Sequence, residues 1–218
     1  CSSDLVLRAA LRARGGTVVA AGVRALAPEG GGVRVALDDG RSWSCSLALV
    51  CCGARSAPLM QPLGAVAPLI GERGYSIHSA THQWPADLPT TVFEARSVVL
   101  SRFDSGLRAS SFLEFGDPDA PGDPRKWDAI AGHLRALGIG FSDAPERWVG
   151  PRPTLPDYLP AIGRLRASPQ ILYAFGHQHL GMTLSAVTAE IIAAMAHDGQ
   201  APVDVTPFRI ERFGTRRR

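Results

Sequence analysis

Hydrophobic and polar positions predict a helix at the start of the chain. Apolar residues recur there at helical spacing, with arginines between them: Leu5, Val6, Ala9, Ala10 and Ala13. Gly15-Gly16 is a good C-terminal stop, so the pattern predicts a helix over about residues 3–14. No strand and no initiator Met precede this helix, and we therefore expect that a further segment lies upstream of Cys1.

Short β-rich runs follow the helix. They predict three strands, at residues 17–20, 23–26 and 33–37. Asp38-Asp39-Gly40 predicts a hairpin turn after the third strand. The continuous apolar run 47–52 closes on Gly53, which is typical of a strand buried on both faces in a parallel sheet.

The pattern becomes strictly alternating after Pro68. It predicts four antiparallel strands, at residues 75–80, 91–93, 98–103 and 107–115. Turn residues such as Asp104-Ser105-Gly106 separate them. One apolar face, which includes Trp127 and Leu134, predicts a helix over about residues 125–137.

The last third of the chain returns to the first pattern. Residues 150–160 are too rich in proline for a helix, residues 171–175 predict a short strand, and about 183–197 predict the last helix. The order predicts a mixed α/β (α+β) fold. One domain of residues 1–68 and 151–218 would be interrupted by an antiparallel-sheet domain of residues 69–150 with one helix.

Composition and charge narrow the class of protein. Hydrophobic residues make up 45% and charged residues 20% of the chain, as in an ordinary globular enzyme. The formal charge of +3 equals the charge of Arg216, Arg217 and Arg218, which we expect to be a solvated tail and not a nucleic-acid site. We find no apolar run near the ~18 residues of a membrane span and no signal-peptide pattern, so we expect a cytoplasmic protein.

The four cysteines do not predict a metal site. Cys1, Cys45, Cys51 and Cys52 form no Cys-x-x-Cys pair, and no histidine lies at ligand spacing from them. Cys51 and Cys52 fall within an apolar run, where cysteine usually acts as a small buried hydrophobe. A disulfide framework is not expected, and a reducing compartment fits.

A glycine-rich turn at residues 176–183 is the first candidate for chemistry. It joins a predicted strand to a predicted helix, and free N–H groups at a helix start stabilise negative charge. The spacing alone equally fits an ordinary turn capped near Thr183. His177 and His179 could suggest a metal, but two histidines without a nearby carboxylate more often serve structure, and His177 is the better active-site neighbour.

Arg152 is the second candidate. It stands between Pro151 and Pro153 on stiff backbone, which suits the placement of a guanidinium that grips a carboxylate with two hydrogen bonds. The alternative is a pair with Asp157 or another surface acid. Two further positions each allow two interpretations. Gly53 ends a buried strand, either at a ligand site or at an ordinary turn. Tyr75 either lines a pocket or packs in the core.

Taken together and in order, these segments resemble the D-amino-acid oxidase superfamily of FAD-dependent oxidoreductases. Residues 173–183 (YAFGHQHLGMT) are similar to its bacterial D-amino-acid dehydrogenase branch, and residues 150–157 (GPRPTLPD) resemble its Gly-x-Arg-Pro-x-x-Pro-Asp element. The strand through Gly53 and the pair Arg73-Gly74 also resemble segments of this superfamily. The family's Gly-x-Gly-x-x-Gly motif is absent from the chain, so the resemblance covers the family's C-terminal part.

The resemblance implies a partial FAD-binding, Rossmann-like domain with an inserted substrate domain. It implies that Arg152 binds the substrate carboxylate, with Tyr75, His78 and His177 at the substrate pocket. It implies FAD contacts by Val23, Cys52, Gly53, Gly150, Gly176, His177, Gly181, Met182 and Thr183. No metal and no nucleic acid are implied.

The implied reaction is oxidative deamination of D-amino acids. A hydride passes from the substrate Cα to flavin N5, and the imino acid hydrolyses to a 2-oxo acid and ammonia. No side-chain base is required. The alternatives are oxidation of secondary amino acids or glycine (D-proline, hydroxyproline, sarcosine) and a non-catalytic remnant or subunit. Partners would be an electron acceptor, through which the protein could lie at the inner membrane, and the missing N-terminal half.

Overall fold

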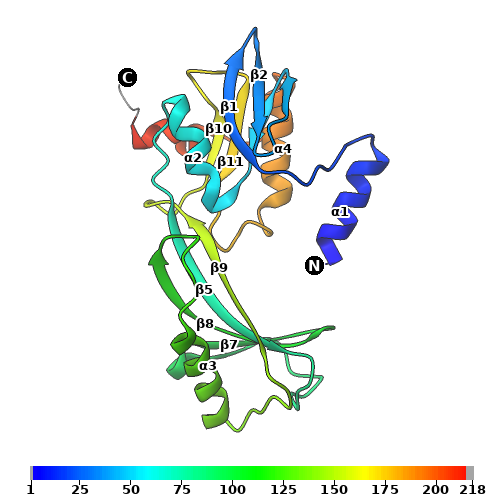
Figure 1. Ribbon diagram of the computed structural model, residues 1–218, viewed down its shortest axis with the longest axis vertical. Coiled ribbons are helices and arrows are strands. Elements are labelled where there is room, and N and C mark those ends of the chain that lie inside the picture. Colours follow the sequence, from blue (N-terminus) through cyan, green and yellow to red (C-terminus); the bar gives the residue numbers. More distant parts are fainter. Residues whose placement is uncertain (1, 215–218) are drawn as a thin grey trace.

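The computed structural model describes residues 2–214, so Cys1 and the predicted tail of Arg216, Arg217 and Arg218 lie outside the described residues. The molecule is elongated, with an upper and a lower part (Figure 1). Helix α1 (Ser2–Ala13) projects from the upper part, as the helical spacing predicts. Its apolar side chains, among them Leu5 and Leu11, are exposed.

A three-stranded antiparallel meander follows α1. Its strands are β1 (Val23–Glu29), β2 (Gly32–Leu37) and β3 (Ser42–Cys45), in that order. The predicted turn at Asp38-Asp39-Gly40 joins β2 to β3. The predicted strand at residues 17–20 is wrong: these residues run as an irregular connection, because no neighbouring strand pairs with them.

The second sheet contains the chain's parallel pair. Its order is β10 (Ala161–Arg164), β11 (Ile171–Phe175), β4 (Ala48–Val50), with β11 parallel to β4 and antiparallel to β10. Side chains of β11 alternate between two layers. Leu172 and Ala174 pack on helix α4 (Ser185–Ala196), while Tyr173 and Phe175 pack with Met60 of helix α2 (Ser56–Met60).

The interpretation of residues 47–52 as a strand buried on both faces is wrong. The strand is limited to three residues of β4, at the edge of its sheet, and the Leu49 side chain is 46% exposed. Cys51 and Cys52 are exposed free thiols, not buried hydrophobes. The physical reason is that β4 is an edge strand: Val50 packs in the core with Met60, whereas Leu49 and Cys51 line an open cavity.

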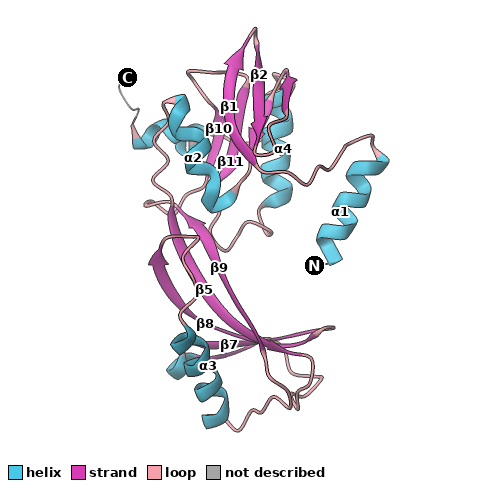
Figure 2. Ribbon diagram, viewed as in Figure 1, coloured by secondary structure: helices cyan, strands magenta, loops and turns pink. Residues whose placement is uncertain are grey.

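The lower part is a five-stranded sheet with one helix. The strands are β5 (Ile70–Ser79), β6 (Thr91–Phe93), β7 (Val98–Phe103), β8 (Gly106–Gly116) and β9 (Glu146–Thr154), and their order is β6-β7-β8-β5-β9. All pairs are antiparallel, as predicted. Helix α3 (Pro124–Ala136) covers one face and packs through Ile130 and Leu134 (Figure 2). Short 3₁₀ turns complete the chain, at Gly53–Arg55, Gln61–Leu63, Glu94–Arg96, Thr206–Phe208 and Ile210–Phe213.

Strands β5 and β9 join the two parts. They pair from Ile70 opposite Thr154 to His78 opposite Glu146, and they run from the lower sheet to the upper part (Figure 1). Strand β9 was not predicted, because Pro151 and Pro153 lack N–H groups. The sheet accepts both prolines because β9 is its edge strand. At both positions the backbone N and C=O face away from β5, so no hydrogen bond between the strands is lost. Strand β9 also crosses the boundary predicted at residue 150, so the division into domains stays a prediction.

On the α3 face, a charged network fixes the loop before α3 to the sheet. Glu114 on β8 accepts a hydrogen bond from the Tyr75 hydroxyl at 2.6 Å and contacts Lys126 Nζ at 2.5 Å. Arg73 lies 3.5 Å from the same carboxylate and donates to the carbonyls of Ala120 and Pro121 at 2.8 Å. The network therefore holds the loop, the helix and the two central strands at one point.

We expect Glu114→Gln to lower the melting temperature at neutral pH, because a neutral amide cannot pair with Lys126 and Arg73. The hydrogen bond with Lys126, and then that from Tyr75, lowers the pKa of Glu114. The stabilisation is therefore present above the ordinary carboxyl pKa of ~4.3 and is lost as the pH falls through the lowered value. A loss of about 1–2 kcal/mol corresponds to about 2–8 °C.

Thermal unfolding of the variant and the parent from about pH 7 to about pH 3 checks this expectation. Glu29→Gln is the matched control, since Glu29 forms an exposed pair with Arg34 at 2.9 Å. The gap in melting temperature should close in acid for Glu114→Gln and stay small throughout for the control. A gap that stays constant with pH would contradict the role of the carboxylate.

Candidate functional site

The candidate site is a cavity near the upper ends of β5 and β9, where Glu72 and Arg152 lie. Its volume is about 900 Å³. Side chains from β5, the 3₁₀ turn Glu94–Arg96, β7, β8, α3, β9 and the turn after β11 line it. The charged and titratable ones are Glu72, Arg96, His133, Arg152 and His179. The sheet residues and the turn after β11, which are far apart in the chain, thus meet at one cavity.

Arg152 lies at this cavity on β9, directly across from Glu72 on β5. Its guanidinium lies over Gly74, where a Cβ atom would fall 2.6 Å from both Nη1 and Nη2. A larger residue at position 74 would displace the guanidinium, so the glycine is needed for the position of Arg152. The side chain remains 36% exposed and can receive a ligand from the cavity.

The alternative partner of Arg152 is excluded by the geometry. Asp157 forms a two-point ion pair with Arg212, at 2.6 Å to Nε and 3.1 Å to Nη2. The acid beside Arg152 is instead Glu72, whose Oε1 is 4.0 Å from Nη1. That distance is too long for a hydrogen bond, so the guanidinium keeps its donors for another group.

The glycine-rich turn is attached to β9 beside Arg152. The N–H of Gln178 donates to the carbonyl of Pro153 at 3.1 Å, and its Nε2 donates to the carbonyl of Tyr158 at 2.7 Å. Gly176 has φ +84 and Gln178 has φ +52, so the chain reverses sharply there. The reversal carries His179 into the same cavity as Arg152.

His177 lies elsewhere, although the sequence favoured it over His179 as the neighbour of the substrate. Its Nε2 is 3.1 Å from the Thr188 hydroxyl on α4, and burial lowers the pKa of the imidazole. It lines a second cavity of about 510 Å³ with Leu49, Cys51 and Gly181. The structure therefore does not bring His177 to the cavity of Arg152, and its place at the substrate pocket stays a prediction.

The start of the last helix also differs from the prediction. Helix α4 begins at Ser185, not at Thr183, because residues 181–184 form a turn in which the Leu184 N–H donates to the Leu180 carbonyl. Within residues 2–214, the N–H groups of Gly181, Met182 and Thr183 have no protein acceptor. The turn thus keeps three backbone N–H groups without a protein acceptor, and Gly181, the first of these residues, lines the second cavity.

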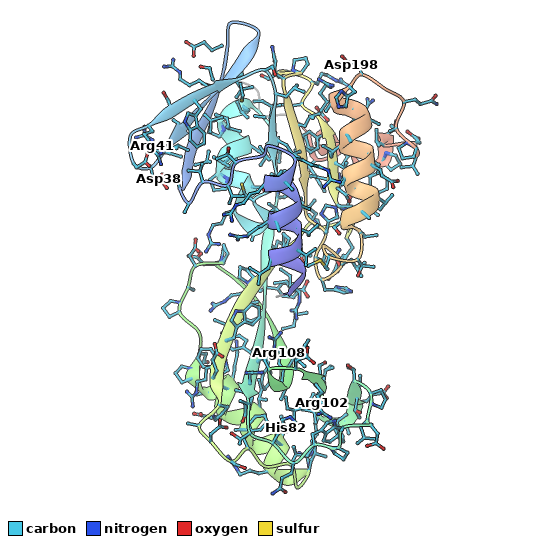
Figure 3. The ribbon with its side chains drawn as sticks, turned by 90° about the vertical axis from the view of Figure 1, so that its right-hand side faces the viewer. Asp38, Arg41, His82, Arg102, Arg108 and Asp198 are labelled. Carbon is cyan, nitrogen blue, oxygen red and sulfur yellow. The ribbon has the colours of Figure 1, made fainter. Side chains whose placement is uncertain are left out.

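Tyr75 and His78 are not brought to Arg152. Tyr75 points to the α3 face, where it is 1% exposed and its ring centroid is 5.3 Å from that of Trp127. His78 pairs across the sheet with Arg108, which Figure 3 labels in the lower part of the molecule. Neither residue lines the cavity of Arg152, since Tyr75 faces the core and His78 lies farther along β5. Their place at the substrate pocket stays a prediction.

The remaining predicted cofactor residues lie in separate places. Gly53, with φ +55, follows the exposed Cys52 at the end of β4, and the 3₁₀ turn it begins contacts β9. Gly150 lies on β9, opposite Gly74 of β5. Val23 begins β1 in the meander, which is a separate sheet. Gly181 lines the second cavity, whereas Gly53, Gly150 and Val23 do not.

Glu72, Thr154 and His179 are site residues that the sequence did not predict. Alternation on two paired strands would have put Glu72, Gly74 and Arg152 on one face, but the pairing of β5 with β9 was not foreseen. Among the described residues, no group of three or more His, Cys, Asp or Glu side chains could hold a metal ion. No helix in residues 2–214 is long and apolar enough to cross a membrane.

Several known proteins are similar to this chain. Residues 5–195 match the DAO family model, described as FAD dependent oxidoreductase. A D-amino-acid oxidase of Bradyrhizobium diazoefficiens is 33% identical over 78% of the chain, and a D-amino acid dehydrogenase of Cereibacter sphaeroides is 28% identical over 88%. The chain spans 41% and 44% of these two relatives.

Solved structures agree on the fold. Glycine oxidase from Geobacillus kaustophilus has a TM-score of 0.73 at 19% identity, over 88% of this chain and 52% of its own. L-proline dehydrogenase from P. horikoshii has a TM-score of 0.76 at 15% identity, over 93% of this chain and 56% of its own. The mixed α/β fold is thereby confirmed. Because the family model matches most of the chain, the protein belongs to the DAO family of FAD-dependent oxidoreductases.

Proposed function

We propose that the protein oxidises amino acids, and D-amino acids in particular, with FAD as its cofactor. The observation that carries the proposal is Arg152: its guanidinium lies over Gly74 at a cavity, and within residues 2–214 it makes no hydrogen bond to protein and only a long ion pair of 4.0 Å with Glu72. Such a guanidinium is suited to a carboxylate. The names of the two relatives, a D-amino-acid oxidase and a D-amino acid dehydrogenase, favour D-amino acids.

The residues near the second cavity fit a flavin. Gly181 has only His177 Cβ near its own Cβ position, at 3.8 Å, so a flat ring can approach the backbone. The free N–H groups of residues 181–183 can stabilise negative charge at a flavin edge. Cys52, Gly53, Gly176 and His177 would complete this contact. FAD, when bound, supplies the acceptor for the hydride that leaves the substrate Cα.

The chain's own residues would bind and orient the substrate. Arg152 would fix the carboxylate and thereby decide which Cα–H bond faces the cofactor. His179 and Phe112 would border the substrate side chain. We propose residues 69–150 as the substrate domain and residues 1–68 and 151–218 as part of the FAD domain, in a cytoplasmic protein that passes electrons to a separate acceptor.

Arg152→Leu should raise the amino-acid concentration needed for half-maximal flavin reduction by about 100-fold, because a charge-assisted pair of hydrogen bonds is lost. The measurement is anaerobic mixing of the FAD-saturated protein with D-alanine, followed by flavin absorbance. Arg152→Lys keeps the positive charge but not the two-pronged guanidinium, and we expect this concentration to rise about 10-fold. Arg147→Leu is the control on the same strand, since Arg147 pairs with Asp128 at the surface.

Equal behaviour of the Arg152 and Arg147 variants would refute the carboxylate role. The same assay with sarcosine, glycine and D-proline tests oxidation of secondary amino acids or glycine, the second candidate function. Faster reduction by these substrates than by D-alanine would replace the first proposal with the second. A flavin that no amino acid reduces would indicate a non-catalytic subunit.

Gly181→Val should weaken FAD binding at least 10-fold while the melting temperature stays unchanged, because the added side chain occupies open space that the cofactor needs. Titration of flavin fluorescence measures this affinity. Gly140→Val is the matched control, since a Cβ at Gly140 meets nothing within 4 Å and Gly140 lies outside the turn. Unchanged FAD affinity in Gly181→Val would remove this turn from the cofactor site.

A further inference from the structure

Glu72 is a charged group at the cavity that carboxylate binding by Arg152 does not use. Its side chain is 8% exposed, and Thr154 Oγ1 donates a hydrogen bond to Oε2 at 2.8 Å. Burial of a carboxylate is costly unless its oxygens have partners. Within residues 2–214, no group donates a hydrogen bond to Oε1, the oxygen that stands 4.0 Å from Arg152 Nη1.

The charges around the cavity make this carboxylate distinctive. Glu72 is the one acid among the described residues that line it, and the other charged or titratable lining residues are Arg96, His133, Arg152 and His179. Arg96 Nη1 lies 3.4 Å from His133 Nδ1. A small carboxylate bound to Arg152 alone would therefore stand beside a buried negative charge, which weakens its binding.

An α-amino acid removes that conflict. Its carboxylate and its ammonium group are attached to one carbon atom, so they present opposite charges a few ångströms apart. Arg152 and Glu72 present the complementary charges at a similar separation. Thr154 fixes one carboxylate oxygen and leaves the other toward the cavity, so the receiving group is already in place.

We propose that Glu72 binds the substrate ammonium and thereby makes the cavity selective for zwitterionic α-amino acids over simple carboxylates. This inference rests on the proposed function, because it places the substrate carboxylate on Arg152. Thr154 is the positioning residue that holds Glu72. The selectivity would exclude 2-oxo acids, the products of the reaction, from the same place.

A second role for Glu72 would be only to aim the guanidinium of Arg152. The two roles differ in one measurable respect. If Glu72 only aims Arg152, its removal weakens every carboxylate ligand alike. If Glu72 binds the ammonium, its removal weakens the binding of amino acids and strengthens the binding of carboxylates that have no amine.

The test is a ligand-observed NMR titration of the protein with D-alanine and with propionate, which is the same molecule without its amine. The parent protein should bind D-alanine about 10-fold more tightly than propionate. In Glu72→Gln the amide oxygen can still accept a hydrogen bond from Thr154. This variant should bind D-alanine at least 10-fold more weakly and propionate about threefold more tightly than the parent protein. Glu146→Gln is the control, because it removes an exposed acid from the far end of the same strand pair.

Each result of the titration has a defined meaning. Equal weakening of both ligands in Glu72→Gln, or no change in either, would overturn ammonium binding and leave the role of Arg152 intact. A parent protein that binds neither ligand would overturn the proposed function itself. Thr154→Val should give a smaller loss of D-alanine affinity in the same direction, and full affinity there would remove Thr154 from the site.

Discussion

The pairing of β5 with β9 is the interaction on which the rest of the structure depends. It connects the lower sheet to the upper part, and its register sets Glu72 opposite Arg152 and Gly74 opposite Gly150. A shift of one residue would turn every side chain of the shifted strand to the other face. In β9 the shift would take Arg152 out of the cavity, and in β5 it would take Tyr75 out of the core that it shares with Trp127 and α3.

Sequence choices along these strands protect that register and keep the face open. The prolines at 151 and 153 leave β9 as an edge strand, and the outward carbonyl of Pro153 accepts from Gln178, which draws the turn after β11 to the site. Gly74 leaves room for the guanidinium. On the opposite face, Glu114 joins both central strands to α3. One sheet thus has a structural face and a binding face.

Local patterns predicted most elements but not the contacts between distant ones. Alternation identified the strands at residues 91–93, 98–103 and 107–115, and helical spacing identified α1 and α3, because these signals lie within a few neighbouring residues. Arg152 was recognised by its stiff, proline-flanked backbone. Glu72 was missed because its role depends on a partner 80 positions away along the chain. The choice between His177 and His179 depended on the φ of Gln178, which residue spacing does not encode.

A crystal structure of the protein with D-alanine tests the central claim most directly, because it locates the ligand without reference to turnover. The account predicts that the ligand carboxylate contacts both terminal nitrogens of Arg152 and that its amine lies against Oε1 of Glu72. A ligand bound away from Arg152, or one with its amine turned from Glu72 toward solvent, would contradict the account.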